Sequence, residues 1–319
     1  MKNFNKGKFL ITGGAGFIGS NIVEKLLELG EKVIVFDNLS TGREENLRDF
    51  LKNPNFKFIQ GDLRKEKEVE EAVREVDYIL HQAALPSVGR SILDPKSTFE
   101  SNVSGTLNLL FAAKKYKVKK IVYASSSSIY GPTKILPKKE NMLPSPISPY
   151  ALSKLTGEKL CQIFSENYSL PTVCLRYFNV FGPRQDPNSE YAAVIPKFVS
   201  AFLNDKRPTI YGDGLQSRDF TFVENVVEAN LKALYSKFNN GQVFNIACGN
   251  QTSLLELLDF LNKIFSKNIE PDFAKERQGD IKHSFADISK AEKGLNYSSR
   301  VFFEQGLKTT IDWFKRYKV

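Results

Sequence analysis

The stretch Thr12-Gly13-Gly14-Ala15-Gly16-Phe17-Ile18-Gly19 decides the fold. It follows the apolar run Lys8–Thr12, which is typical of a buried strand, and it opens a periodic segment that predicts a helix to about Gly30. The glycines at positions 13, 16 and 19 have the spacing of a dinucleotide-binding turn, in which backbone N–H groups at a helix N-terminus approach a pyrophosphate. Glycine-rich turns are common, so this interpretation depends on the residues that follow.

An acidic residue lies where such a turn requires one. Asp37 directly follows the apolar run Val33–Phe36 and stands 18 positions beyond Gly19. A carboxylate at the end of the second strand accepts hydrogen bonds from a free ribose 2′-hydroxyl and repels a 2′-phosphate, which favours NAD over NADP. Arg43 is close enough in the sequence that NADP is not excluded.

Short apolar strands and amphipathic helices alternate through the first half of the chain. This alternation predicts an α/β protein with a Rossmann, doubly wound parallel sheet and helices on both faces. The predicted strands are Lys8–Thr12, Lys32–Phe36, Phe56–Ile59, Tyr78–Leu80, Ile121–Ala124 and Thr172–Arg176. The later helices predicted between them are Glu66–Val73, Ser97–Lys115 and Tyr150–Tyr168.

The alternation ends near Asn179, and the rest predicts a smaller, mixed α/β substrate domain. We expect residues 1–180 to form the NAD-binding domain and residues 181–319 to form mainly the substrate-binding domain, with a strand at about 243–247 that returns to the first sheet. Glycine, proline and asparagine predict loops at Gly182–Pro187 and Arg207–Arg218. Helices are predicted at Ile195–Leu203, Val223–Ser236, Leu254–Phe265 and Phe303–Tyr317.

Composition argues against several classes of protein. The 319 residues carry a formal charge of +9, but the lysines are scattered and no basic stripe with interleaved aromatics predicts nucleic-acid binding. No apolar run reaches the roughly 18 residues of a membrane span, and no signal peptide precedes the first strand, so we expect a cytoplasmic protein without a membrane partner. Three separated cysteines and two histidines predict neither a disulfide framework nor a metal site.

A serine run and a tyrosine–lysine pair supply candidate catalytic groups. The run Ser125–Ser128 follows the fifth predicted strand, and Tyr150 and Lys154 lie four positions apart on one face of the next helix. A free phenol has a pKa of about 10. The ammonium of Lys154 and a positively charged nicotinamide would favour the phenolate and lower this pKa toward neutrality. Tyr150 is therefore the candidate base, with a serine hydroxyl to share its proton.

Further motifs run along the whole chain. They are TGGAGFIGS at 12–20, DNLSTG at 37–42, GDLR at 61–64, HQAA at 81–84, ASSSSIYG at 124–131, SPYALSK at 148–154, LRYFNVFGPRQDP at 175–187, YGDG at 211–214, SRDF at 217–220 and RQGD at 277–280. Together they resemble the extended short-chain dehydrogenase/reductase family and, within it, the nucleotide-sugar 4-epimerases.

The resemblance implies NAD as the cofactor and Ser126, Tyr150 and Lys154 as catalytic residues. The implied cofactor site consists of Gly13, Gly16, Phe17, Ile18, Gly19, Asp37, Asn38, Gly42, Asp62, Leu63, Ala83, Ala84, Asn102, Tyr150, Lys154 and Tyr177. The implied substrate site consists of Ser87, Ser126, Ser127, Asn179, Ala193, Val194, Lys197, Tyr211, Arg218, Arg277, Asp280 and Ser284. Asn179, Arg218 and Arg277 would bind the diphosphate and uridine, because a guanidinium fork matches phosphate oxygens.

The activity that the resemblance implies is NAD-dependent, reversible epimerisation at C4 of a UDP-hexose. Tyr150 would remove the proton of the 4-hydroxyl while hydride passes to NAD⁺. The 4-keto sugar would then turn over in the site, and hydride would return to its opposite face. NAD would end as it began and stay bound.

Other functions on the same fold stay open. Related sugar 4,6-dehydratases carry an Asp-Glu pair, and related UDP-glucuronate decarboxylases carry a glutamate, in the segment that corresponds to Ser126–Ser128, where this chain has only serines. UDP-glucuronate 4-epimerase, dehydratase and decarboxylase remain alternatives. A non-catalytic NAD-sensing protein is a further one, because fold does not fix function, although the intact Ser126, Tyr150 and Lys154 argue against it.

One position bears on the choice of sugar. Ser284 lies where, in the family that the chain resembles, a bulky tyrosine restricts the enzyme to non-acetylated hexoses. This small residue and the segment Asp186–Pro196 imply that UDP-GlcNAc and UDP-GalNAc are accepted beside UDP-glucose and UDP-galactose. The family also implies a homodimer built from the helices Ser97–Lys115 and Tyr150–Tyr168.

Overall fold

A seven-stranded parallel sheet forms the centre of the computed structural model, which describes residues 7–187, 193–276 and 281–317. Its strands lie in the order β11-β6-β5-β4-β1-β2-β3, so the predicted α/β class and doubly wound sheet are confirmed. The strands are β1 (Lys8–Thr12), β2 (Lys32–Asp37), β3 (Phe56–Gln60), β4 (Tyr78–His81), β5 (Lys120–Ser126), β6 (Thr172–Tyr177) and β11 (Asn240–Ile246).

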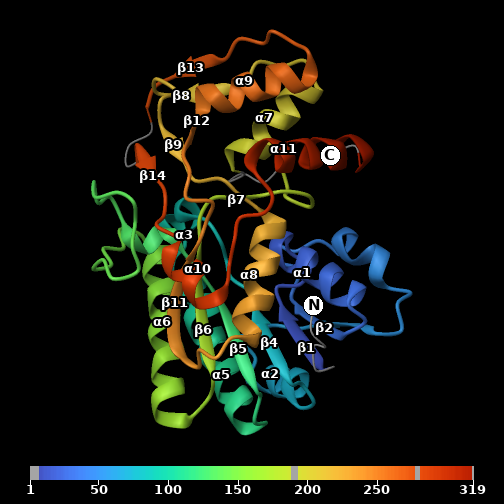
Figure 1. Cartoon of the computed structure of the whole chain (residues 1–319). Coiled ribbons are helices and arrows are strands. Elements are labelled where there is room, and N and C mark those ends of the chain that lie inside the picture. The colour runs from blue at the N-terminus through green and yellow to red at the C-terminus, as the bar shows by residue number, and fades with distance from the viewer. Residues whose placement is uncertain (1–6, 188–192, 277–280, 318–319) are drawn as a thin grey trace.

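Helices cover both faces of this sheet (Figure 1). One face packs against α1 (Phe17–Glu28), the short η1 (Glu44–Phe50), α8 (Val223–Tyr235) and α10 (Ser289–Leu295). The other face packs against α2 (Glu66–Val73), α5 (Gly105–Lys115) and α6 (Pro149–Tyr168). Both faces are therefore buried, which is why the central strands are almost continuously apolar rather than alternating.

The helix predicted at Ser97–Lys115 is longer and less regular than expected. It begins at Pro95, where Oδ1 of Asp94 accepts a hydrogen bond from the backbone N–H of Ser97 at 3.0 Å. It then runs through α4 (Pro95–Phe99), a widened π-type turn η2 (Glu100–Ser104) and α5. A separate short helix, α3 (Val88–Leu93), precedes it and was not predicted, because six residues carry too little periodicity.

A second, smaller core lies beyond the carboxyl ends of the main strands. It is formed by α7 (Val194–Leu203), α9 (Leu254–Phe265) and α11 (Phe303–Tyr317), which gather at the top of Figure 1. Short strands connect it to the sheet. They are β7 (Val180–Phe181) with β10 (Thr221–Phe222), β8 (Thr209–Tyr211) with β13 (Asp272–Ala274), and β9 (Ser217–Arg218) between β12 (Thr252–Ser253) and β14 (His283–Ser284).

The loop predicted at Arg207–Arg218 is wrong in part, because it contains β8 and β9. Each pairs with a strand from a distant part of the sequence: Ile210 faces Phe273, and Arg218 faces Ser284. Pairing over such separations leaves no local pattern, and the glycines on either side of Asp213 dominate the sequence signal.

His81 links the end of β1 to the widened turn. Its Nδ1 lies 2.6 Å from the Thr12 hydroxyl, and its Nε2 lies 2.9 Å from the Thr106 hydroxyl. Thr106 donates its one hydroxyl hydrogen to the carbonyl of Asn102 at 2.6 Å. The proton of His81 is therefore on Nε2, which donates to Thr106, while Nδ1 accepts from Thr12. Burial lowers the pKa of His81 to about 3, so the ring is neutral in the folded protein.

Folding stability should consequently fall in acid. An unfolded histidine has a pKa of about 6.5, so below that value the unfolded chain binds a proton that the folded protein excludes. From there down to the folded pKa, His81 should remove roughly 1 kcal/mol of unfolding free energy per pH unit. The free energy of unfolding, measured with urea at several pH values in this window, should change less with pH for His81→Gln than for the wild type. Equal slopes for the two proteins would contradict this assignment.

Candidate active site

A cleft of about 720 Å³ follows the carboxyl ends of the parallel strands. It passes between the turns after β1 and β4, where the strand order reverses and where doubly wound sheets bind their ligands. Every residue predicted at the cofactor lines this cleft except Asn102. The structure thus brings together residues that lie up to 164 positions apart, from Gly13 to Tyr177.

The glycine turn is shaped for a pyrophosphate. Gly13 has a φ of +69°, and a Cβ on it would lie 2.6 Å from the backbone nitrogen of Ala83. A Cβ on Gly19 would collide with the carbonyl oxygen of Gly13. Helix α1 has no side-chain cap at its N-terminus, so its first backbone N–H groups can bind an anion there. These features fit a dinucleotide cofactor.

Asp37 closes the ribose end of the cleft. Its side chain is buried, and it accepts hydrogen bonds from the backbone N–H groups of Ala15 at 3.0 Å and Leu39 at 2.8 Å. Burial raises the pKa of this carboxyl group, and the two N–H groups act in the opposite direction. A Cβ on Gly42 would lie 2.9 Å from the carboxylate, so glycine keeps this side open. The geometry suits a carboxylate that receives ribose hydroxyls.

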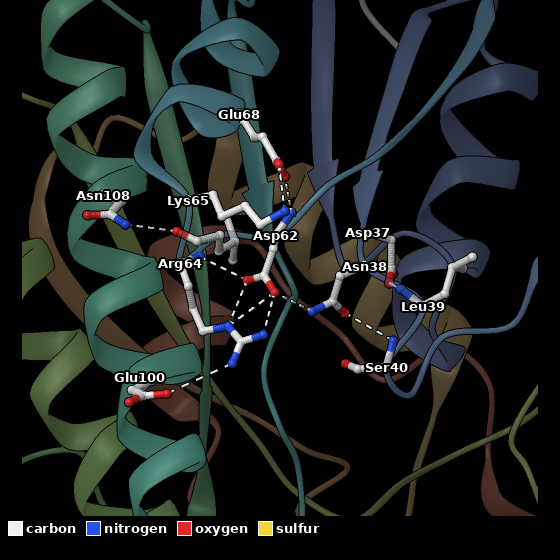
Figure 2. A network of polar contacts seen from close by, with 11 residues as sticks. Asp37, Asn38, Leu39, Ser40, Asp62, Arg64, Lys65, Glu68, Glu100 and Asn108 are labelled. Atoms are coloured by element: carbon white, nitrogen blue, oxygen red, sulfur yellow. Dashed lines mark hydrogen bonds and ion pairs between the residues drawn. The ribbon is translucent and has the colours of Figure 1, made fainter.

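A polar network orders the loops after β2 and β3, as Figure 2 shows. Asp62 accepts hydrogen bonds from Arg64, the shortest being 2.6 Å from Nη2, and from Nδ2 of Asn38 at 3.2 Å. The guanidinium of Arg64 lowers the pKa of Asp62 to about 2. The carbonyl of Leu63 accepts from Asn108 at 2.9 Å. Asp62 and Leu63 are thus held at the cleft wall, where an adenine ring is expected.

Asn102 does not line the cleft, contrary to the prediction. It is buried in the widened turn, where Oδ1 accepts from the backbone N–H of Leu85 at 2.7 Å. Its Nδ2 donates to the carbonyl of Leu85 at 3.2 Å and to the hydroxyl of Ser153 at 3.0 Å. Asn102 therefore holds Leu85, which does line the cleft, against α6.

Tyr177 lies at the end of β6 and on the cleft wall. Its hydroxyl lies 3.2 Å from Oε1 of Gln82 and 2.8 Å from Nδ2 of Asn230 on α8. Burial raises the pKa of this phenol, so Tyr177 stays protonated. A phenol that stays protonated is not a candidate base, so this role falls to Tyr150.

The catalytic candidates meet where β5 faces α6. Lys154 is buried, its Nζ donates to the carbonyl oxygen of Ala124 at 2.8 Å, and burial lowers its pKa to about 8. Loss of solvent raises the pKa of Tyr150, while a hydrogen bond with the Ser126 hydroxyl lowers it. The Ser126 oxygen already accepts from Ser128 at 2.9 Å, so its own proton is free to point to Tyr150.

A second cleft, of about 620 Å³, adjoins the first at Ala193, which lines both. Several predicted substrate residues line it, namely Asn179, Ala193, Val194, Lys197, Tyr211 and Arg218. Lys206 and Arg207, which were not predicted as site residues, add two more cations. The lining residues that the structure describes include no carboxylate, so this cleft suits a diphosphate.

The remaining predicted substrate residues lie elsewhere. Ser87 lines the first cleft and caps α3, where its hydroxyl accepts from the backbone N–H of Arg90 at 3.3 Å. Ser127 begins the short η3 (Ser127–Tyr130). Ser284 is buried in β14 beside Arg218 and is not among the lining residues of either cleft. Arg277 and Asp280 lie outside the described residues.

Asp219 lies next to Arg218 in the SRDF motif and behind the second cleft, and no role for it was predicted from the sequence. Its buried carboxylate accepts backbone N–H groups of Cys248 at 2.8 Å, Gly249 at 3.0 Å and Ala286 at 3.3 Å. Burial raises its pKa to about 6. Asp219 thus links three segments of the chain beside Arg218. Its partners are distant in the sequence, so the motif by itself could not predict these contacts.

Comparison with known proteins agrees with this geometry. Residues 9–247 match the NAD dependent epimerase/dehydratase family. The UDP-glucose 4-epimerase of Mycolicibacterium smegmatis is 37% identical over 309 residues, which are 96% of this chain and 98% of that protein. UDP-N-acetylglucosamine 4-epimerase from Methanobrevibacter ruminantium M1, solved in complex with UDP-N-acetylmuramic acid, gives a TM-score of 0.94 at 41% identity, covering 98% of this chain and 100% of that one.

A third similar protein was solved with its cofactor. UDP-glucuronic acid 4-epimerase from Bacillus cereus, in complex with UDP-glucuronic acid and NAD, gives a TM-score of 0.90 at 36% identity, covering 97% of this chain and 99% of that one. The chain therefore belongs to the NAD dependent epimerase/dehydratase family, as its motifs indicated, and its cofactor is NAD. No helix in the part of the chain that the structure describes is long and apolar enough to cross a membrane.

The position of Asp37 leads to a test of cofactor choice. Asp37→Asn keeps the size of the side chain but removes the charge, so NAD should bind about tenfold more weakly, as expected for one lost hydrogen bond to a charged group. The affinity for NADP should fall less, because the repulsion between the Asp37 carboxylate and the 2′-phosphate disappears. Titration calorimetry on cofactor-free protein measures both. Asp49→Asn, an exposed carboxylate on η1, is the control. Unchanged preference in the Asp37 variant would exclude Asp37 as the ribose ligand.

Proposed function

We propose that this protein is a UDP-sugar 4-epimerase that uses its NAD catalytically. The observation that carries the proposal is that Tyr150 and Lys154 line the cofactor cleft, which meets a second, positively lined cleft at Ala193. Ser126–Ser128 has no carboxylate, so the segment lacks the extra acid and base that elimination of water requires. This favours epimerisation over dehydration.

The side chains have complementary tasks in such a reaction. Bound NAD⁺ supplies the hydride acceptor, and its positive ring favours the phenolate of Tyr150. Lys154, one helical turn away on the same face, would add a second positive charge, and the Ser126 side chain lowers the pKa of the same phenol. Tyr150 can then take the proton of the sugar 4-hydroxyl and return it once the sugar has turned over.

The second cleft would hold the nucleotide. Lys197, Lys206 and Arg218 place positive charge along it, and Asn179 and Tyr211 add polar groups. The diphosphate would be fixed there while the hexose reaches toward Tyr150 in the first cleft. Firm binding of UDP combined with a loosely held sugar allows the 4-keto intermediate to turn over without leaving.

We infer that acetylated sugars are among the substrates. Ser284 is small and adjoins Arg218 through the pairing of β14 with β9. The proposal rests on the small size of this side chain, which is buried and lines neither cleft. Hexosamine and uronic-acid nucleotides appear with similar structures, so the substrate panel below includes both.

We also propose a homodimer through α5 and α6. Both helices carry large apolar side chains that stay exposed in the single chain: Phe111 is 47% exposed, Leu152 44% and Ile163 47%. A second copy that packs the same two helices against them would bury these side chains.

Purified protein incubated with UDP-GlcNAc, UDP-galactose or UDP-glucuronic acid, without added NAD, should yield the C4 epimer. Chromatography that resolves the epimers measures this. Tyr150→Phe should reduce turnover at least about a hundredfold, which is the contribution typical of a general base. Tyr168→Phe, which changes an exposed tyrosine on the same helix, should retain wild-type turnover. Absence of any epimer, even after NAD is supplied, would overturn the proposed function.

The role of Ser284 has its own test. Ser284→Tyr should abolish turnover of UDP-GlcNAc while UDP-glucose is still converted, because the ring would occupy the volume of the N-acetyl group. UDP-glucose turnover also reports that the variant folds. Ser289→Tyr, an exposed position a few residues further on, is the control. Equal loss for both sugars, or for neither, would remove Ser284 from sugar selection.

A further inference from the structure

Three consecutive residues of β5 each interact with one side chain of α6. The carbonyl of Ala124 accepts from Lys154 at 2.8 Å, and the hydroxyl of Ser125 donates to Oε1 of Glu158 at 2.5 Å. The Ser126 side chain lowers the pKa of the Tyr150 phenol. The helix residues stand at 150, 154 and 158, so they lie on one face, a turn apart. Two of the three contacts belong to the candidate catalytic groups, and the third belongs to Glu158.

Glu158 is held rigidly by an ion pair. The side chains of Glu158 and Arg176 are each 4% exposed. Nε of Arg176 donates to Oε1 at 2.9 Å, and Nη2 donates to Oε2 at 2.8 Å. Arg176 lies on β6, directly opposite Ser125 in the register of the sheet. Glu158 therefore joins α6, β5 and β6 at one point just below the catalytic candidates.

The helix and the strand also approach unusually closely here. A Cβ on Gly157 would collide with the hydroxyl of Tyr123, which is the β5 residue just before Ala124. Glycine thus allows α6 to sit against the strand, and polar contacts then fix its rotation and height. Small displacements at such a junction change the geometry of catalytic groups.

Stability alone does not account for a buried ion pair. Removing two charges from water costs several kcal/mol per ion, and apolar replacements of equal volume are often as stable. The Ser125 hydroxyl adds no apolar packing either. The arrangement is better explained by the position that it enforces on the end of β5, where Ser125 lines the cofactor cleft.

Glu158 also acts on Lys154 through its charge. Burial lowers the pKa of Lys154 to about 8, while Cys161 and the carboxylate of Glu158 both act to raise it. Without this negative charge Lys154 would lose its proton at lower pH. The other titratable groups that interact with Glu158 are Tyr123 on β5, Cys174 and Arg176 on β6, and Lys290 on α10.

We propose that Glu158, braced by Arg176, is a positioning residue that holds the end of β5 through Ser125 and keeps Lys154 charged. This inference rests on the proposed roles of Tyr150, Lys154 and Ser126. It assigns Glu158 no contact with substrate or cofactor; it acts through the residues that have such contacts.

Ser125→Ala tests the mechanical part of the proposal, which is that Glu158 holds the end of β5 through Ser125. This variant removes the hydroxyl contact with Glu158 and leaves the ion pair between Glu158 and Arg176 intact. We expect kcat for epimerisation to fall about tenfold, the effect of one such hydrogen bond, with KM for the UDP-sugar and the melting temperature unchanged. Ser165→Ala is the matched control, because its hydroxyl joins α6 to the carbonyl of Leu170 far from the cleft. Wild-type kcat in Ser125→Ala would overturn this part.

Glu158→Gln tests the electrostatic part of the proposal, which is that the negative charge of Glu158 keeps Lys154 protonated. The basic limb of the kcat–pH profile should move to lower pH, because Lys154 deprotonates more easily, whereas Ser125→Ala should leave that limb in place. A merely structural role would lower activity without moving the limb, and that result would overturn the electrostatic part. If Glu158→Gln does not fold, the double variant E158Q/R176Q removes both charges together, and the Ser125→Ala result still decides the mechanical part.

The wild type and Tyr150→Phe separate this inference from the proposed function. If the wild type produces no epimer, the proposed function fails and the Ser125 variant has no reference. If the wild type is active, Tyr150→Phe is inactive and Ser125→Ala matches the wild type, the function stands and only the role of Glu158 fails.

Discussion

The close contact between the turns after β1 and β4 is the constraint on which the rest of the molecule depends. A Cβ on Gly13 would lie 2.6 Å from the nitrogen of Ala83, and one on Gly14 would lie 2.6 Å from a methyl group of Val35 on β2. Because neither residue has a side chain, β1, β2 and β4 converge with the start of α1 at one point. The reversal of strand order then opens the cofactor cleft directly above that point.

Buried ionisable groups lie in the two clefts or next to residues that line them, and each of these groups has hydrogen-bond partners that offset the cost of its desolvation. Asp37 and Asp219 accept backbone N–H groups, Glu158 accepts the fork of Arg176, and Lys154 donates to a backbone carbonyl. Such groups cost free energy wherever they are buried, and their accumulation at strand ends is characteristic of functional sites. Their partners are mostly backbone, so the charges fix loops and strand ends in place.

Much of the main sheet could be predicted from local patterns. The limits of the seven main strands were predicted to within three residues of those observed. This was possible because a strand that is buried on both faces has a nearly continuous apolar sequence. The glycine turn, Asp37 and the Tyr150–Lys154 pair could be proposed from spacing together with their order along the chain, since each lies at a fixed offset from a strand or helix end. The second core was less visible, because β8 and β9 have only remote partners.

The sequence by itself determined the class of fold, the cofactor turn and the candidate base, because these depend on periodicity, on the absence of a side chain at glycine and on positions one helical turn apart. Only the tertiary structure decided that Asn102 supports Leu85 instead of lining the cleft, and that Glu158 meets Ser125 and Arg176. Both assignments depend on which strands are neighbours in the sheet. Contacts between residues distant in the chain are made by folding, and a single sequence carries no local mark of them.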